Sequence, residues 1–105
     1  MPYRLYVIEL DSKVLSNKKF MSDNPDYLPG KPCLYVGQTA RAPEVRFQQH
    51  LNGYKSNRYA RDYGIRLYPD IVDLLDPFKT RAEAEEAEAK LAKSLRKFGY
   101  AVWYG

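Results

Sequence analysis

The 105-residue sequence contains one cysteine and one histidine, and it has no long hydrophobic run. The lone cysteine, Cys33, cannot form a disulfide within the chain, and we expect it to be a small buried residue in a reducing compartment. One cysteine and one histidine also cannot supply the usual ligand set of a zinc site. The apolar runs are too short to span a membrane, and the segment after Met1 is strand-like, unlike a signal peptide. We therefore expect a cytoplasmic protein without a membrane partner.

The composition is that of one globular domain. Hydrophobic residues make up 45% of the chain and charged residues 29%, which excludes a disordered protein. A chain of this length can form a single hydrophobic core without cross-links, and no repeat or linker divides it. We therefore expect one domain over residues 1–105.

The net charge of +4 is concentrated in one stretch of the chain. Between Gln38 and Arg66 lie six of the 17 basic residues but only two of the 13 acidic residues, so the remaining charges balance. The same stretch holds Tyr54, Tyr59 and Tyr63. Basic side chains interleaved with aromatic ones suit nucleic acid, because they bind phosphates and stack on bases. A solvated basic face with inward-packing tyrosines explains the same composition equally well.

Sequence patterns predict a small α/β domain. Runs of β-branched, aromatic and other apolar residues predict strands at Arg4–Leu10, Cys33–Gly37, Pro69–Leu75 and in the final AVWYG. Helices are expected at Ser12–Phe20, from Pro43 to a stop at Gly53, at Ser56–Tyr63 and at Thr80–Phe98. We expect these helices to cover one or both faces of the sheet.

The helix at Thr80–Phe98 has the clearest signals. Thr80 and Glu83 form a capping box at its start, and Gly99 stops it. Apolar residues recur at intervals of three and four and predict a core-facing stripe: Ala84, Ala87, Leu91, Leu95 and Phe98. We expect Phe98 and the later Trp103 to lie in the core.

Glu88 borders that stripe and is expected to project toward the sheet. A carboxylate in such a place must be paired, protonated or bound to a cation, unless it reaches water past its small neighbours. On another predicted helix, Arg46 and His50 are four residues apart and share one face. If these three side chains meet Tyr6 and Tyr35 on one side of the sheet, the set suits phosphodiester hydrolysis. A divalent metal would sit at the carboxylate, arginine would face the phosphoryl oxygens, and a tyrosine or histidine would accept the proton of water.

The same residues, in the same order, resemble the GIY-YIG nuclease superfamily. Arg4-Leu5-Tyr6 resembles its first motif and Tyr35-Val36-Gly37 its second. The stretch GQTARAPEVRFQQH is similar to its helix motif, and EAEEAEAKL to the helix that carries its metal-binding glutamate. The resemblance implies an α/β (α+β) fold with a three-stranded antiparallel sheet flanked by helices. It also implies a divalent-metal-dependent endonuclease that hydrolyses phosphodiester bonds in nucleic acid, in DNA rather than RNA.

The resemblance assigns catalytic roles to five residues. Tyr6 would be the general base, and Tyr35 would position water or a phosphate oxygen. Arg46 would bind the scissile phosphate, and His50 would orient it or assist proton transfer. Glu88 would hold one Mg²⁺ or Mn²⁺ ion.

A second set of residues is expected to bind the substrate. Gly37 would let the backbone approach it, and further contacts are expected from Gln38, Lys55, Arg58 and Tyr59. The asparagine that the family usually carries near its end is not evident, and Tyr104 or Gln38 is the candidate to replace it. The residues from Asp11 to Lys31 form an insertion relative to the family, which is either a specificity loop or packing.

Selectivity is expected from substrate shape, from a protein partner or from this insertion. Two alternatives to a nuclease stay open. One is a nucleic-acid-binding domain with the same fold and with weak or no catalysis. The other is a small interaction domain whose tyrosines are core and whose charges are surface.

Overall fold

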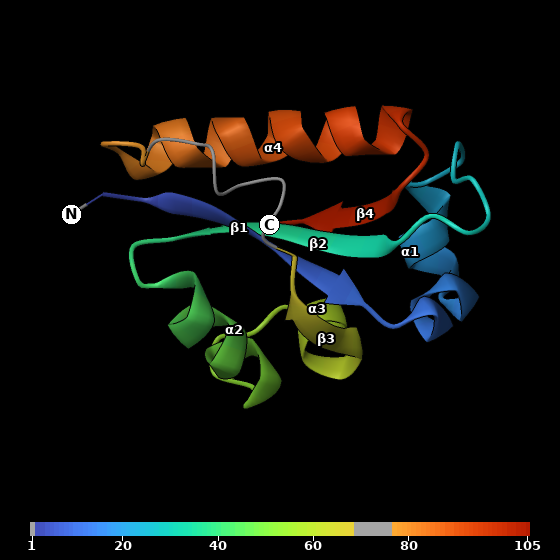
Figure 1. The fold of residues 1–105 in the computed structure, drawn as a ribbon, viewed down its shortest axis with the longest axis horizontal. Coiled ribbons are helices and arrows are strands. Elements are labelled where there is room, and N and C mark those ends of the chain that lie inside the picture. The colour runs from blue at the N-terminus through green and yellow to red at the C-terminus, as the bar shows by residue number, and fades with distance from the viewer. Residues whose placement is uncertain (1, 69–76) are drawn as a thin grey trace.

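The computed structural model describes residues 2–68 and 77–105, and it has one sheet between two layers of helices (Figure 1). The strand order is β3-β1-β2-β4. The strands are β1 (Arg4–Leu10), β2 (Cys33–Thr39), β3 (Gly64–Leu67) and β4 (Ala101–Tyr104). Strand β1 is antiparallel to β2 and β3, whereas β4 is parallel to β2. The fold is therefore α+β with a mixed four-stranded sheet.

The expected three-stranded antiparallel sheet is thus extended by β4. A parallel neighbour requires a connection that crosses over the sheet, and the chain reaches β4 through the helix α4 (Arg81–Lys97), which packs on one face. The other face carries η1 (Ser12–Ser16), α1 (Lys18–Ser22), α2 (Pro43–Leu51) and α3 (Arg58–Tyr63).

The alternation of side chains along the strands divides the core in two. Tyr6, Ile8 and Tyr35 face the layer of short helices and belong to a cluster that includes Phe20 and Tyr59. The residues between them face α4 and form the second cluster: Val7, Leu34, Val36, Ala92, Leu95 and Val102. Both faces of the sheet are covered, which explains why β1 and β2 read as nearly continuous apolar runs.

Most predicted elements are present. The two predicted strands at Arg4 and Cys33 and the final strand are confirmed, whereas the strand predicted at Pro69–Leu75 lies outside the described residues. Strand β3 was not predicted, because it is four residues long and follows α3 without a break. Helix α3 begins two residues later than predicted, because the Asn57 side chain caps it by accepting hydrogen bonds from the N–H groups of Tyr59 and Ala60.

The insertion from Asp11 to Lys31 contributes packing, one of its two expected roles. Val14 and Phe20 are fully buried in the first core cluster. The buried Asn24 side chain pairs with the backbone of Val102, accepting from its N–H at 2.7 Å and donating to its carbonyl at 3.1 Å. The insertion therefore occupies the outer edge of β4, which would otherwise present unpaired backbone groups.

The prediction for Phe98 is wrong, since this side chain is 68% exposed. Helix α4 ends at Lys97, and Phe98 is its C-cap, so the residue leaves the helical stripe that predicted its burial. Trp103 is half-buried and packs against the first core cluster, as expected. Among the described residues, no helix combines the length and the apolar character needed to cross a membrane.

Candidate active site

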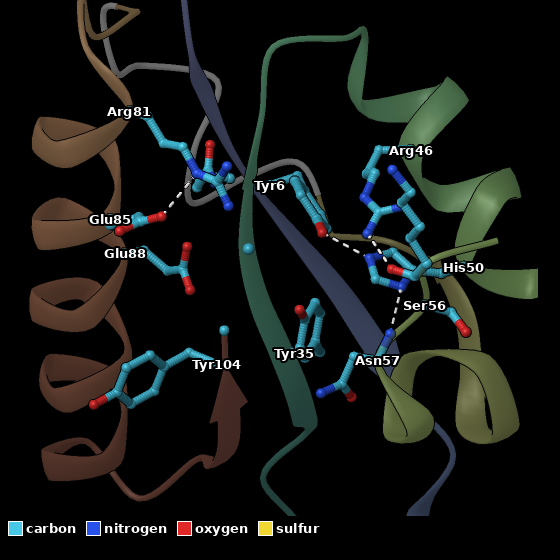
Figure 2. Close-up of a pocket in the computed structure, with 14 residues that line it drawn as sticks. Tyr6, Tyr35, Arg46, His50, Ser56, Asn57, Arg81, Glu85, Glu88 and Tyr104 are labelled. Atoms are coloured by element: carbon cyan, nitrogen blue, oxygen red, sulfur yellow. Dashed lines mark hydrogen bonds and ion pairs between the residues drawn. The ribbon is translucent and has the colours of Figure 1, made fainter. Parts of the chain in front are cut away.

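A pocket of about 520 Å³ opens beside β2, just beyond the end of β4. The paired residues of these two strands end at Val36 and Tyr104, so Gly37 and Gln38 of β2 border the pocket. Figure 2 shows side chains entering it from opposite sides. The lining comprises Tyr6, Tyr35, Gly37, Gln38, Arg46, His50, Lys55, Ser56, Asn57, Arg81, Glu85, Glu88, Tyr104 and Gly105.

The five residues predicted to be catalytic all line this pocket, but they come from both layers. Tyr6, Tyr35, Arg46 and His50 lie on the side of the short helices, whereas Glu88 reaches the pocket from α4 on the other face (Figure 2). The expectation that they meet on one side of the sheet is therefore corrected. Two layers can share one pocket because β4 ends at Tyr104 and leaves the edge of β2 open.

Gly37 makes room for Tyr6. The two residues are directly paired across β1 and β2. A Cβ atom on Gly37 would overlap Cζ and Oη of Tyr6, so the hydroxyl end of that ring occupies the space of the missing side chain. Glycine at residue 37 is therefore explained by the space that the Tyr6 ring needs. From the sequence, its expected role was instead to let the backbone approach the substrate.

His50 is 1% exposed and is held by two hydrogen bonds. The backbone N–H of Asn57 donates to Nδ1 at 3.1 Å, and Nε2 lies 2.7 Å from Oη of Tyr6. A backbone amide can only donate, so Nδ1 carries the lone pair and the proton of the neutral ring is on Nε2. His50 therefore donates to the Tyr6 hydroxyl oxygen.

The charge states of these groups follow from burial and from Arg46. Burial and then the Arg46 charge lower the pKa of His50 to about 4, so the ring is neutral at pH 7. Burial raises the pKa of Tyr6 to about 12, although Arg46 and the Tyr35 hydroxyl act to lower it. Burial, followed by the nearby Tyr6, raises the pKa of Tyr35 further still. Of the two hydroxyl oxygens, that of Tyr6 accepts a hydrogen bond from His50, which favours its ionised form.

The Arg46 guanidinium is half-buried and fixes the chain that follows α2. It donates to the carbonyl oxygens of Tyr54 at 3.2 Å and Lys55 at 2.7 Å, and to the Gln49 side chain at 3.2 Å. Three of its five N–H groups are used in this way, and a further hydrogen bond from Arg46 acts to lower the pKa of Tyr6. These contacts hold a fixed positive charge beside Tyr6.

Burial of Glu88, which is 5% exposed, raises the pKa of its carboxyl to about 7. The charge of the neighbouring Glu85 raises it too, whereas a hydrogen bond from the Gly105 backbone and the Arg81 charge act in the opposite direction. Arg81 itself is ion-paired with Glu85 at 2.9 Å. None of the ion pairs within residues 2–68 and 77–105 includes Glu88.

These oxygens suit one hard divalent cation. Besides the unpaired Glu88 carboxylate, Oε1 of Gln38 is buried without a hydrogen-bond partner in the described part of the chain. Mg²⁺ prefers oxygen ligands and often takes only one or two carboxylates, with waters and substrate phosphates as its other ligands. Glu88 is the candidate ligand because its buried carboxylate lines the pocket, although no group of three or more His, Cys, Asp and Glu among the described residues could hold a metal.

Two residues predicted to bind substrate lie elsewhere. Tyr59 is 1% exposed and packs against Phe20 and Trp103, with its hydroxyl 3.2 Å from the Asn17 side chain, so it belongs to the core. Arg58 is exposed above the Tyr59 ring and does not line the pocket. Lys55 and Gln38 do line it, as does Tyr104.

Sequence reasoning missed five residues at the pocket: Ser56, Asn57, Arg81, Glu85 and Gly105. Asn57 carries a recognisable helix-capping signal, but its contact with His50 depends on how α2 and α3 pack. Arg81 and Glu85 are spaced as an ordinary surface ion pair, so nothing in the sequence separates them from the other charges of α4.

Comparison with known proteins identifies one family. The family model described as the GIY-YIG catalytic domain matches residues 29–101. This range includes β2, α2 and α4, whereas β1 with Tyr6 precedes it. Searches of curated proteins and of solved structures gave no significant match.

Proposed function

The chain belongs to the GIY-YIG family of nuclease domains, and on that premise we propose that it is a divalent-metal-dependent endonuclease that hydrolyses phosphodiester bonds in DNA. The observation that carries the proposal is the shared pocket of Tyr6, Arg46, His50 and Glu88. A hydroxyl that can ionise, a fixed cation and an unpaired buried carboxylate are the groups this reaction needs.

Tyr6 is proposed as the general base that takes the proton of the attacking water. Its oxygen accepts a hydrogen bond from Nε2 of His50 and lies close to the Arg46 charge and the Tyr35 hydroxyl. All three favour the phenolate over the phenol. His50 acts as a positioning residue that donates to this oxygen, because its Nδ1 lone pair is already used by Asn57.

Arg46 is proposed to bind the scissile phosphate through its guanidinium group, which lines the pocket beside Tyr6. A guanidinium suits the negative charge that develops on the nonbridging oxygens. Glu88, with Gln38 nearby in the pocket, would hold Mg²⁺ or Mn²⁺. A cation held there would supply polarisation of a phosphoryl oxygen and would stabilise the leaving oxygen.

A second candidate is a nucleic-acid-binding domain with weak catalysis. It is favoured by the pKa of Glu88, which at about 7 leaves a substantial part of the carboxyl protonated at neutral pH and so weakens cation binding. The two candidates make different predictions for cleavage but the same prediction for binding.

Nicking of supercoiled plasmid and of branched DNA tests the proposal, with Mg²⁺, Mn²⁺ or EDTA. We expect cutting by the wild type that requires the cation, loss of cutting in Glu88→Ala, and reduced cutting and binding in Arg46→Ala. Glu86→Ala is the matched control, because Glu86 is an exposed glutamate of the same helix that pairs with Lys90. Binding without cutting by the wild type would favour the second candidate.

A further inference from the structure

A second, smaller groove adjoins the active-site pocket. It measures about 220 Å³ and shares Arg46 and Lys55 with that pocket. Its remaining lining consists of Thr39, Ala40, Arg41, Gln49 and Tyr54, and no acidic residue of the described ranges 2–68 and 77–105 lines it. A chain of phosphates bound at Arg46 can therefore continue past the cationic side chains of Arg41 and Lys55 in this groove.

Tyr54 gives the groove an exposed aromatic face. Its side chain is 52% exposed, and Nζ of Lys55 lies 5.6 Å from its ring centroid. Arg41 and Lys55 are exposed as well. A groove with cationic walls and an open aromatic ring has the chemistry of surfaces that bind single strands, in which phosphates pair with the cations and bases stack on the ring.

The backbone under Tyr54 is fixed, although the ring is exposed. The Tyr54 N–H donates to the Gln49 carbonyl at 2.9 Å, and the carbonyl groups of Tyr54 and Lys55 both accept from Arg46. Lys55 has φ = 44°, in the left-handed region that non-glycine residues rarely adopt. Arg46, which is proposed to bind the scissile phosphate, thus also holds Tyr54 at a fixed distance from that phosphate.

We propose that this groove binds an unpaired nucleotide next to the scissile phosphate, with its base stacked on Tyr54. The inference rests on the proposed nuclease function and names its substrate class. Bases within a duplex have both faces covered by their neighbours, whereas an unpaired base can offer a face to the ring. The substrate is therefore single-stranded nucleic acid, or a branched one that is single-stranded beside the cut.

Binding in EDTA tests the groove separately from catalysis. Fluorescence anisotropy would compare a labelled single DNA strand of about 12 nucleotides, the same sequence as RNA, and the same sequence as a DNA duplex. We expect Tyr54→Ala to weaken binding of the single strand by about tenfold or more and binding of the duplex by less than about twofold. Tyr54→Phe keeps the stacking face and is expected to bind like the wild type.

Phe98→Ala is the matched control, because Phe98 is also an exposed aromatic and lies at the far end of α4 from the pocket, and it should change neither affinity. Melting temperatures verify that each variant folds.

If Tyr54→Ala weakens the binding of single strand and duplex equally, or weakens neither, the proposed role of the groove is contradicted. This holds even if the wild type cuts plasmid. Loss for DNA but not for RNA, or the reverse, supports the groove and identifies the nucleic acid. Selective loss of single-strand binding without any cleavage by the wild type supports the groove and contradicts only the nuclease proposal.

Discussion

The backbone N–H of Asn57 donates to Nδ1 of His50, 3.1 Å away, and this contact decides what the histidine can do. With Nδ1 occupied, the neutral ring must carry its proton on Nε2 and donate it to the Tyr6 oxygen 2.7 Å away. The sequence permits His50 to orient the phosphate or to transfer a proton. The contact favours a third role, that of stabilising the ionised tyrosine.

The tautomer of His50 is directly measurable. Nitrogen-15 NMR of the imidazole should show a protonated Nε2 and an unprotonated Nδ1 at pH 7, because the pKa of the ring is lowered to about 4 by burial and by Arg46. A protonated Nδ1 would contradict the assignment.

Substitutions of His50 can show whether it acts as a hydrogen-bond donor to Tyr6 or as a base. Gln can donate an N–H to Tyr6 and accept from Asn57, so His50→Gln should retain more nicking activity than His50→Ala. Equal activity of the two variants would mean that donation to Tyr6 contributes little.

Gly37→Ala is expected to impair activity by moving Tyr6. The added methyl group overlaps the hydroxyl end of the tyrosine ring, which must shift away from His50. Overpacking of this kind costs about 1–3 kcal/mol of stability, so the protein should still fold. Nicking rates of Gly37→Ala, Tyr6→Phe and the double variant form the test, and the two losses should not add, since both act on one hydroxyl. Full activity in Gly37→Ala would refute the placement of Tyr6.

Glu88→Gln is expected to stabilise the protein at alkaline pH. The folded-state pKa of Glu88 is raised from 4.5 to about 7, so the folded chain binds a proton that the unfolded chain has lost, and stability falls as pH rises through this range. At pH 8 the ionised, buried carboxylate costs about 3 kcal/mol, which a neutral amide of similar size avoids. The melting temperature of Glu88→Gln should exceed that of the wild type by several degrees at pH 8 and match it near pH 4.5.

The same melting experiment reports on metal binding without any measure of activity. Mg²⁺ or Mn²⁺ should raise the melting temperature of the wild type at pH 8 and leave Glu88→Gln unchanged, because only the carboxylate gains from the cation. The stabilisation should fade below pH 7 as Glu88 becomes protonated. An equal effect of the cation on both proteins would place its binding site elsewhere.

Replacing Lys55 with glycine should favour stability but weaken the binding of single-stranded DNA. Its φ of 44° costs about 1 kcal/mol for a residue with a side chain, and glycine adopts it freely. Lys55→Gly should therefore be more stable to urea than Lys55→Ala by about 1 kcal/mol, while both lose affinity for single-stranded DNA equally. Equal stability of the two variants would mean that the left-handed backbone is not strained.

The sequence predicted the elements that carry strong local signals. The capping box at Thr80 and the apolar runs of β1 and β2 fix their elements without help from the rest of the chain. The parallel pairing of β4 with β2, the short β3 and the exposure of Phe98 depend on packing between distant segments, which local patterns do not encode. Tyr59 was assigned to the substrate because it lies among basic residues, yet its neighbours in space are Phe20 and Trp103.

The pH dependence of plasmid nicking at saturating Mg²⁺ tests the central claim most directly, that Tyr6 is the base and His50 its hydrogen-bond donor. Because the pKa of Tyr6 is raised to about 12, the phenolate fraction grows about tenfold per pH unit, and the rate should keep rising from pH 7 to pH 9. Tyr6→Phe should abolish this rise. A rate that levels off between pH 6 and pH 7 in the wild type, or a rise that persists in Tyr6→Phe, would contradict the account.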